Sequence, residues 1–229
     1  MNFLKLCQTL RRRAGISGHG PVSVKDQQGE YERVVDWVRQ AWLDLQGFRY
    51  DWRPLWRHET EAVAVEQGSI PLPEDWSQPI LESFTFNGEP LRYVDWRHFP
   101  HDTDAVGQPS AVSRRPDGSL GIWPKPAEAG DLRYEYFAIP QVLDEDVDEP
   151  WLPRHLQDAI VFQALAYYAI YEDAPEIYND AMLKVEDLRR RMVAEMVAGV
   201  QMERQLFNGR DQQRMARQQR AQQQAQQPE

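Results

Sequence analysis

Apolar residues recur every three or four positions near the N-terminus, which predicts two helices there. A short helix is predicted over residues 2–14, with Asn2 as the N-cap and Gly15 as the stop. A longer helix is predicted over residues 30–47, ending at Gly47. We expect each helix to bury one apolar face, formed by Phe3, Leu6, Cys7 and Leu10 in the first and by Val34, Trp37, Val38, Ala41, Trp42 and Leu45 in the second.

The same spacing returns in the C-terminal part of the chain. Trp151-Leu152-Pro153 ends an acidic segment, and we expect a third helix to start there. After a break near Pro175 the pattern resumes and predicts a fourth helix. The expected apolar stripes are Leu156, Ile160, Phe162, Leu165, Tyr168 and Ile170 in the third helix, and Ile177, Met182, Val185, Leu188, Met192, Val193 and Met196 in the fourth.

Between these helical regions the period of the apolar residues changes to two, as in β-strands. The turn sequences Asn87-Gly88 and Pro116-Asp117-Gly118 favour two hairpins, and the prolines at positions 71, 73 and 79 predict a loop. The fold class is therefore predicted as α+β: a bundle of about four helices with an inserted antiparallel β subdomain. Strands are expected over residues 61–66, 80–86, 91–98, 110–115, 119–123 and 130–139.

The composition changes abruptly after Met202. The last part of the chain is rich in glutamine and arginine, and it has too few apolar side chains to offset the entropy lost on ordering. We expect an extended C-terminal tail that a partner orders. The predicted organisation is N-terminal helices over residues 1–56, the β subdomain over 57–140, C-terminal helices over 141–202 and the tail over 203–229.

Charge and composition narrow the class of protein. The chain has 229 residues, enough for one core with an insertion, and a formal net charge of −10. Net negative charge argues against a protein that binds nucleic acid by neutralising phosphates. The one cysteine, Cys7, permits no intramolecular disulfide and is expected in the core. The sequence has neither a membrane-spanning apolar run nor a secretory signal, so we expect a protein that is neither exported nor bound to a membrane.

Several groups of residues could carry chemistry, but none has the spacing of a known motif. His98, His101, Asp102 and Asp104 lie in one loop without the spacing of a metal site. The acidic residues 144–149 lack the glycine of a calcium loop, and we expect them to favour the N-terminus of the third helix instead.

Two further features of the sequence could carry chemistry. The glycine-rich residues 16–21 lack the lysine and spacing of a phosphate-binding loop. Glu61 with Glu66, or Asp95 with His98, could act as acid and base, although any acidic β protein offers such pairs. We therefore predict no catalytic residue, no metal site and no cofactor.

A series of packing and turn motifs runs through about residues 1–200. They include the segment from Phe3 to Leu10, Ala14-Gly15-Ile16-Ser17-Gly18, Arg33-Val34-Val35-Asp36-Trp37-Val38, Leu91-Arg92-Tyr93-Val94-Asp95-Trp96, and Asp148-Glu149-Pro150-Trp151-Leu152-Pro153. Together these motifs resemble the head-to-tail adaptor (connector, or head completion) proteins of tailed bacteriophages. None of the motifs contains a catalytic element.

The resemblance implies a virion structural protein rather than an enzyme. Such adaptors form a homo-oligomeric ring, expected to be a dodecamer, between the phage portal protein and a tail or nozzle protein. Double-stranded DNA passes through the ring during viral genome ejection without sequence-specific binding. The expected location is the head–tail interface of the virion, after assembly in the host cytoplasm.

The resemblance also implies that a C-terminal segment reaches onto the portal. By position and composition, the expected portal-binding residues of this chain are Met202, Gln205, Leu206, Phe207, Arg210, Arg214, Met215, Arg217 and Arg220.

Two alternatives remain open at this point. The chain could be a carbohydrate-active or hydrolytic enzyme in which Trp76, Trp96 and Trp123 form the substrate cleft. Such tryptophans would be exposed, whereas buried tryptophans would favour a structural role. The chain could also be a structural component of the tail or baseplate rather than a protein next to the portal.

Overall fold

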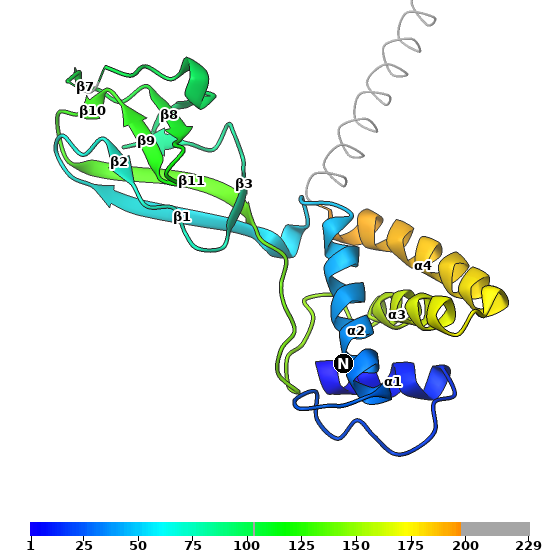
Figure 1. The fold of residues 1–229 in the computed structure, drawn as a ribbon. Coiled ribbons are helices and arrows are strands. Elements are labelled where there is room, and N and C mark those ends of the chain that lie inside the picture. The colour runs from blue at the N-terminus through cyan, green and yellow to red at the C-terminus, as the bar shows by residue number, and fades with distance from the viewer. Residues whose placement is uncertain (103, 198–229) are drawn as a thin grey trace, which may run out of the picture. The chain divides into compact units, whose positions relative to one another are not determined.

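The computed structural model describes residues 1–102 and 104–197, which form two compact units (Figure 1). The helical unit contains residues 1–45 and 142–197, and the β unit contains residues 46–141. This α+β arrangement of four helices and a mostly antiparallel set of strands confirms the predicted fold class. The helices are α1 (Phe3–Arg13), α2 (Glu30–Gly47), α3 (Asp158–Tyr171) and α4 (Pro175–Met196), and two short 3-10 helices are Arg53–Leu55 and Trp96–His98.

The first two helices lie where the sequence predicts them. The Asn2 side chain accepts a hydrogen bond from the Lys5 backbone N–H at 3.0 Å and so caps α1. Gly15, just beyond the end of α1, has a φ of +70°, which favours glycine. Cys7 is buried in the core as expected, and this burial raises the pKa of its thiol to about 12.

The third helix begins at Asp158, so the predicted start near Trp151 is wrong. The intervening residues form turns, in which the Leu156 N–H donates to the Pro153 carbonyl at 2.8 Å and the Gln157 amide donates to the Leu152 carbonyl at 2.9 Å. The prediction of one apolar stripe also fails, because α3 packs against both α1 and α4 and is buried around most of its circumference. Figure 1 shows α3 as the helix between these two neighbours.

The acidic segment 144–149 stabilises α1 rather than α3. The first N–H groups of a helix lack partners within it, and here Phe3 donates to the Asp148 carbonyl at 2.7 Å and Leu4 donates to the Asp146 carbonyl at 3.3 Å. The Asp146 carboxylate also accepts from the Val24 N–H at 2.5 Å. The predicted role of this segment at the start of α3 is therefore wrong.

Strands of the β unit form three sheets (Figure 1). The longest pairing is antiparallel, from Trp56 opposite Phe137 to Val63 opposite Gly130. The strands are β1 (Trp56–Val63), β2 (Ser69–Ile70), β3 (Trp76–Pro79), β4 (Thr85–Phe86), β5 (Glu89–Pro90), β6 (Arg92–Tyr93), β7 (Val106–Gly107), β8 (Ala111–Arg114), β9 (Leu120–Trp123), β10 (Lys125–Pro126) and β11 (Gly130–Ala138).

Both predicted hairpins are present. Strands β4 and β5 pair around Asn87 and Gly88, which have φ values of +51° and +88°, as a tight hairpin turn requires. Strands β8 and β9 pair antiparallel around Gly118, with a φ of +87°. The turn residues in the sequence therefore predicted the positions of these two hairpins correctly.

Several strands differ from the prediction. The strand expected over 61–66 starts at Trp56 and ends at Val63, and only Thr85–Phe86 of the strand expected over 80–86 is extended. The strand expected over 91–98 splits into β6 and the 3-10 helix Trp96–His98, which Asp95 caps by accepting from the Arg97 N–H at 2.9 Å. The loop expected around the prolines contains β3, and the pairings β6–β8 and β7–β10 are parallel.

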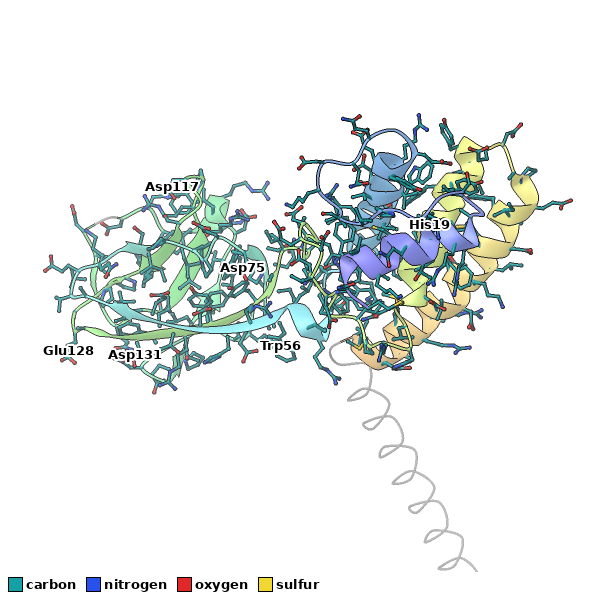
Figure 2. The ribbon with its side chains drawn as sticks, turned by 90° about the horizontal axis from the view of Figure 1, so that it is seen from below. His19, Trp56, Asp75, Asp117, Glu128 and Asp131 are labelled. Atoms are coloured by element: carbon teal, nitrogen blue, oxygen red, sulfur yellow. The ribbon has the colours of Figure 1, made fainter. Side chains whose placement is uncertain are left out.

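A row of aromatic rings forms the core of the β unit. Trp76 stacks on Tyr136 with ring centroids 4.8 Å apart, and Phe84 stacks on Tyr134 at 5.7 Å. The Tyr136 hydroxyl donates to the Asp75 carboxylate at 2.7 Å. On the exposed surface, the Trp56 indole N–H donates to the Glu135 carboxylate at 2.9 Å; Figure 2 labels Trp56 and Asp75.

The two ends of the β unit are joined by a reciprocal pair of hydrogen bonds. The Gln46 side chain donates to the Gln141 carbonyl at 2.8 Å and accepts from the Gln141 N–H at 2.7 Å. Gln46 is buried, so these bonds satisfy an amide that would otherwise lose its contacts with water. The start and the end of residues 46–141 therefore meet at one point.

Asp51→Asn is expected to reduce the pH dependence of the stability of the β unit. Arg49 donates two hydrogen bonds of 2.7 Å to the Asp51 carboxylate and holds the pKa of Asp51 below its ordinary value of 3.8. A carboxyl group with a lowered pKa in the folded state stabilises the fold above its unfolded pKa. That contribution is lost as the pH falls from about 4 through the lowered pKa.

The measurement is urea unfolding, followed by tryptophan fluorescence, at pH 7 and pH 3. The loss of stability at low pH should be smaller for Asp51→Asn than for the wild-type protein. Asp131→Asn is the control, because the Asp131 carboxylate makes no hydrogen bond or ion pair with the described residues of the β unit. An Asp51→Asn variant with the full wild-type pH dependence would contradict the prediction.

Candidate interaction surfaces

One side of α3 exposes aromatic and aliphatic side chains at its C-terminal end. Ile170 and Tyr171 are 65% and 54% exposed. Trp37 of α2 packs against Tyr171 with ring centroids 5.7 Å apart, and the Arg33 guanidinium lies 4.7 Å from the centroid of the Tyr171 ring. Trp37, Ile170 and Tyr171, together with Gln40, Asp44 and Tyr167, border a hollow of about 410 Å³. We call the surface formed by Trp37, Tyr167, Ile170 and Tyr171 the aromatic face.

A second apolar surface lies between α3 and α4. Its hollow has a volume of about 560 Å³, and Leu183, which is 71% exposed, stands at its edge. Charged side chains line it together with apolar ones, a mixture that is common in protein interfaces. We call this surface the α3–α4 groove; it is formed by Phe162, Leu165, Ile177, Asp180, Ala181, Leu183, Lys184 and Asp187.

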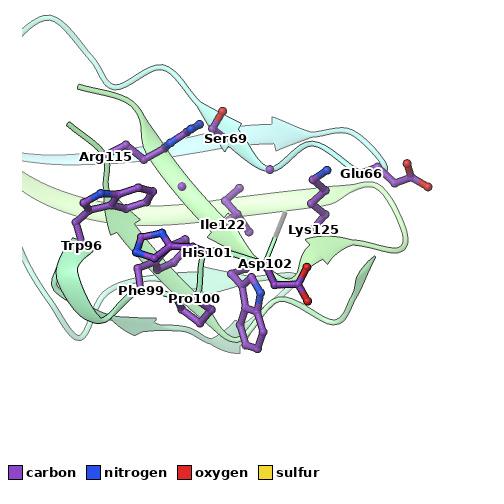
Figure 3. A pocket seen from close by; sticks show the side chains of 13 residues that line it. Glu66, Ser69, Trp96, Phe99, Pro100, His101, Asp102, Arg115, Ile122 and Lys125 are labelled. Atoms are coloured by element: carbon purple, nitrogen blue, oxygen red, sulfur yellow. The ribbon is translucent and has the colours of Figure 1, made fainter. Parts of the chain in front are cut away.

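A third hollow, of about 500 Å³, lies within the β unit (Figure 3). Figure 3 shows Trp96, Phe99 and His101 on one side of it and Glu66 and Lys125 on the other. It is lined by Trp123, Arg115 and Asp102 as well, so aromatic surfaces stand beside two cations and two carboxylates. Such a lining can hold a polar ligand or a protein side chain against an aromatic wall.

Two glycines allow the cationic side chains to lie close to the backbone of this cavity. A Cβ added at Gly68 would lie 3.3 Å from the Lys125 side chain, and a Cβ at Gly121 would lie 3.3 Å from the Arg115 side chain. Arg115 also lies with its guanidinium 5.7 Å from the Trp96 ring centroid. Neither glycine belongs to a sequence motif that would have predicted this role.

Only some of the tryptophans that the enzyme hypothesis places in a substrate cleft line this cavity. Trp96 and Trp123 line it, but Trp76 is buried in the aromatic core of the β unit. A cleft made by all three tryptophans is therefore absent from the described part of the chain.

The two acid–base pairs considered from the sequence are not assembled in the cavity either. Glu66 lines it whereas Glu61 lies on β1. Asp95 instead accepts hydrogen bonds from the Arg97 side chain and backbone, which lower the pKa of Asp95 to about 2. A carboxylate with so low a pKa is a poor proton acceptor near neutral pH.

The residues considered as metal ligands do not converge. His101 and Asp102 line the cavity, while His98 and Asp104 do not. Over residues 1–102 and 104–197, no group of three histidine, cysteine, aspartate or glutamate side chains is placed to hold a metal ion. In the same ranges no helix is both long and apolar enough to cross a bilayer. The expected portal-binding residues, Met202 to Arg220, lie outside the described residues.

The aromatic face and the α3–α4 groove were not identified from the sequence. Phe162 and Ile170 were both interpreted as core residues because they fit helical spacing. One signal was available: α3 is apolar on nearly all sides, which is more apolar surface than one neighbouring helix can cover.

A protein-family model described as SU10 adaptor protein matches residues 1–228. The chain belongs to the SU10 adaptor protein family. This is a phage adaptor-type family, so the chain is a structural adaptor of the virion, and it interacts with other phage head or tail proteins. The resemblance to phage adaptors inferred from the motifs is thus confirmed at the level of the family. None of the curated proteins compared with this SU10 adaptor family member matches it significantly.

Proposed function

We propose that this adaptor forms a ring that joins the portal to the tail and extends the DNA channel. The observation that carries the proposal is the family match, which runs through both units and the C-terminal segment. The net charge of −10 supports it, because a negative protein repels DNA phosphates and lets DNA pass without binding. The proposed ring is a dodecamer at the head–tail interface, assembled in the host cytoplasm and traversed by DNA during genome ejection.

Each part of the chain has a role in this proposal. The helices of residues 1–56 and 141–202 form the body of the ring, and the β insertion of residues 57–140 meets the tail or nozzle protein. The tail of residues 203–229 reaches the portal, where its arginines can pair with carboxylates. Leu206 and Phe207 of the tail, with the preceding Met202, can fill apolar pockets.

The test of this function is assembly with the portal protein of the same phage. Native mass spectrometry and electron microscopy of the mixture should show a ring bound on the portal ring. An adaptor that stays monomeric in the presence of portal would overturn the proposal. Binding to a tail protein without any binding to portal would favour the alternative of a tail or baseplate component.

Removal of residues 203–229 is expected to abolish portal binding while the two units stay folded. The tail contributes little apolar surface, so the circular dichroism spectrum and the urea midpoint of the truncated chain should stay close to those of the full chain. A matched variant keeps the tail length but replaces Arg210, Arg214, Arg217 and Arg220 by glutamine, and we expect it to bind portal at least tenfold more weakly. Full-strength portal binding by the truncated chain would contradict this role.

A further inference from the structure

We propose that neighbouring copies associate head to tail, with the aromatic face of one copy docked in the α3–α4 groove of the next. The occupant of each surface is thus a second copy of this chain. The inference rests on the proposed ring and names the two surfaces that close it.

The two surfaces lie on different sides of one helix. Phe162 in the groove and Tyr171 on the aromatic face are nine residues apart on α3, which at 3.6 residues per turn is about two and a half turns. The Phe162 and Tyr171 side chains therefore point about 180° apart, whereas Ile170, eight residues from Phe162, points about 80° from it. Two different surfaces on opposite sides of a subunit produce head-to-tail association that can close into a ring, whereas a two-fold dimer uses one surface twice.

The exposed side chains and the hollows fit an interlocking contact. Ile170 stands between the 410 Å³ hollow of the aromatic face and a neighbouring hollow of about 250 Å³. Leu183 stands at the edge of the 560 Å³ α3–α4 groove. Each surface therefore offers a projecting aliphatic side chain beside a depression. In the proposed contact Ile170 enters the groove and Leu183 enters the hollow beside Tyr171, in the manner of ridges packed into grooves.

Each of the two surfaces carries charged side chains of both signs. Asp44 lines the hollow of the aromatic face, and Asp187 lines the groove. In addition, Arg33 and Glu172 flank the aromatic face, and Asp180 and Lys184 line the groove. These four side chains form no ion pair with any described residue, unlike nearby Asp187, which pairs with Arg191 at 2.7 Å. Docking of the two surfaces can pair Arg33 with Asp180 and Glu172 with Lys184. Opposite charges at the border of an interface fix its register and speed association.

The test uses one substitution on each surface of the full-length chain, Ile170→Asp and Leu183→Asp. Both side chains are mostly exposed, so both variants should keep the circular dichroism spectrum and unfolding midpoint of the wild type. Val22→Asp is the matched control, because Val22 is 81% exposed in a loop of the same unit and belongs to neither surface. Assembly is measured by native mass spectrometry and sedimentation velocity, alone and on the portal. We expect rings from the wild type and the control, and at least a tenfold loss of assembly for each single variant.

Mixing the two variants distinguishes head-to-tail from two-fold association. Ile170→Asp keeps an intact groove and Leu183→Asp keeps an intact aromatic face, so an equimolar mixture should form pairs of one copy each that cannot extend. If the aromatic face paired with itself, Leu183→Asp would dimerise alone and the mixture would gain no mixed pairs.

The possible outcomes separate this inference from the proposed function. Wild-type rings together with rings from both single variants would overturn the docking proposal and leave the adaptor ring in place. Variants that form rings but fail to bind the portal would also overturn the docking proposal, because the two surfaces would then contact the portal and not a neighbouring copy. A wild-type chain that forms no ring, alone or on portal, would overturn the proposed function itself.

Discussion

Replacement of Trp42 by alanine is expected to destabilise the helical unit by about 3–5 kcal/mol. Trp42 lies on α2, is fully buried, and has its ring centroid 4.9 Å from that of Trp151. Removing the indole leaves a cavity, and the surrounding side chains of a packed helical core can fill it only partly. The measurement is urea unfolding followed by the circular dichroism of the helices, with the free energy obtained by linear extrapolation.

A matched truncation tests whether burial is the cause. Tyr171→Ala also removes an aromatic ring from the helical unit, but that ring is more than half exposed. We expect Tyr171→Ala to change the free energy of unfolding by less than about 1 kcal/mol. Similar losses of unfolding free energy for Trp42→Ala and Tyr171→Ala would show that Trp42 is not packed in the core as described above.

Tyr134 is expected to respond in opposite directions to two substitutions. Tyr134→Ala should destabilise the β unit by about 3–5 kcal/mol, because it removes a fully buried ring that packs on Phe84 and Trp76. Tyr134→Phe should stabilise the unit by about 1 kcal/mol, because it removes only a buried hydroxyl that has no hydrogen-bond partner among the described residues. The pKa of this hydroxyl is raised by burial and then by the charges of Glu61 and Glu59.

Tyr136→Phe provides the comparison for the hydroxyl. Tyr136 lies two residues along the same strand, and its hydroxyl donates to the Asp75 carboxylate at 2.7 Å. Loss of that hydrogen bond should destabilise the β unit by about 1 kcal/mol. Urea unfolding followed by tryptophan fluorescence compares the variants. If Tyr134→Phe and Tyr136→Phe were equally destabilising, the Tyr134 hydroxyl would have a partner in solution.

The elements that the sequence predicted well depend on local signals. α2 has an unbroken apolar stripe and ends at Gly47, so both of its ends were predicted correctly. The hairpins at Asn87-Gly88 and at Gly118 follow from residues that tolerate positive φ. In each case the information lies within a few residues of the feature that it determines.

The errors concern features that depend on contacts between distant residues. The start of α3 was placed too early because Trp151 and Leu152 fit an apolar pattern, although Gln157 and Pro153 hold that stretch in turns. The role of Asp146 at the start of α1 depends on hydrogen bonds across most of the chain. The parallel pairing of β6 with β8 likewise has no local signature.

The candidate surfaces were harder to predict than the fold. Helical spacing assigns Phe162 and Ile170 to an apolar pattern but does not say which positions a neighbouring helix covers. Coverage depends on how α1 and α4 pack on α3 and on the contacts of Trp37 of α2 with Tyr168 and Tyr171, and these are properties of the folded unit. The family membership could be inferred from packing motifs, whereas the two surfaces could be identified only from the folded structure.

The hydrogen bonds between Gln46 and Gln141 have a consequence for how this protein can vary. Because the two ends of residues 46–141 are within reach of each other, a turn of a few residues could replace the whole segment without lengthening the connection from Leu45 to Val142. We therefore expect the segment to be exchangeable as one piece. Recombination or engineering could substitute another module at this point while the sequence of the helical unit on either side stays unaltered.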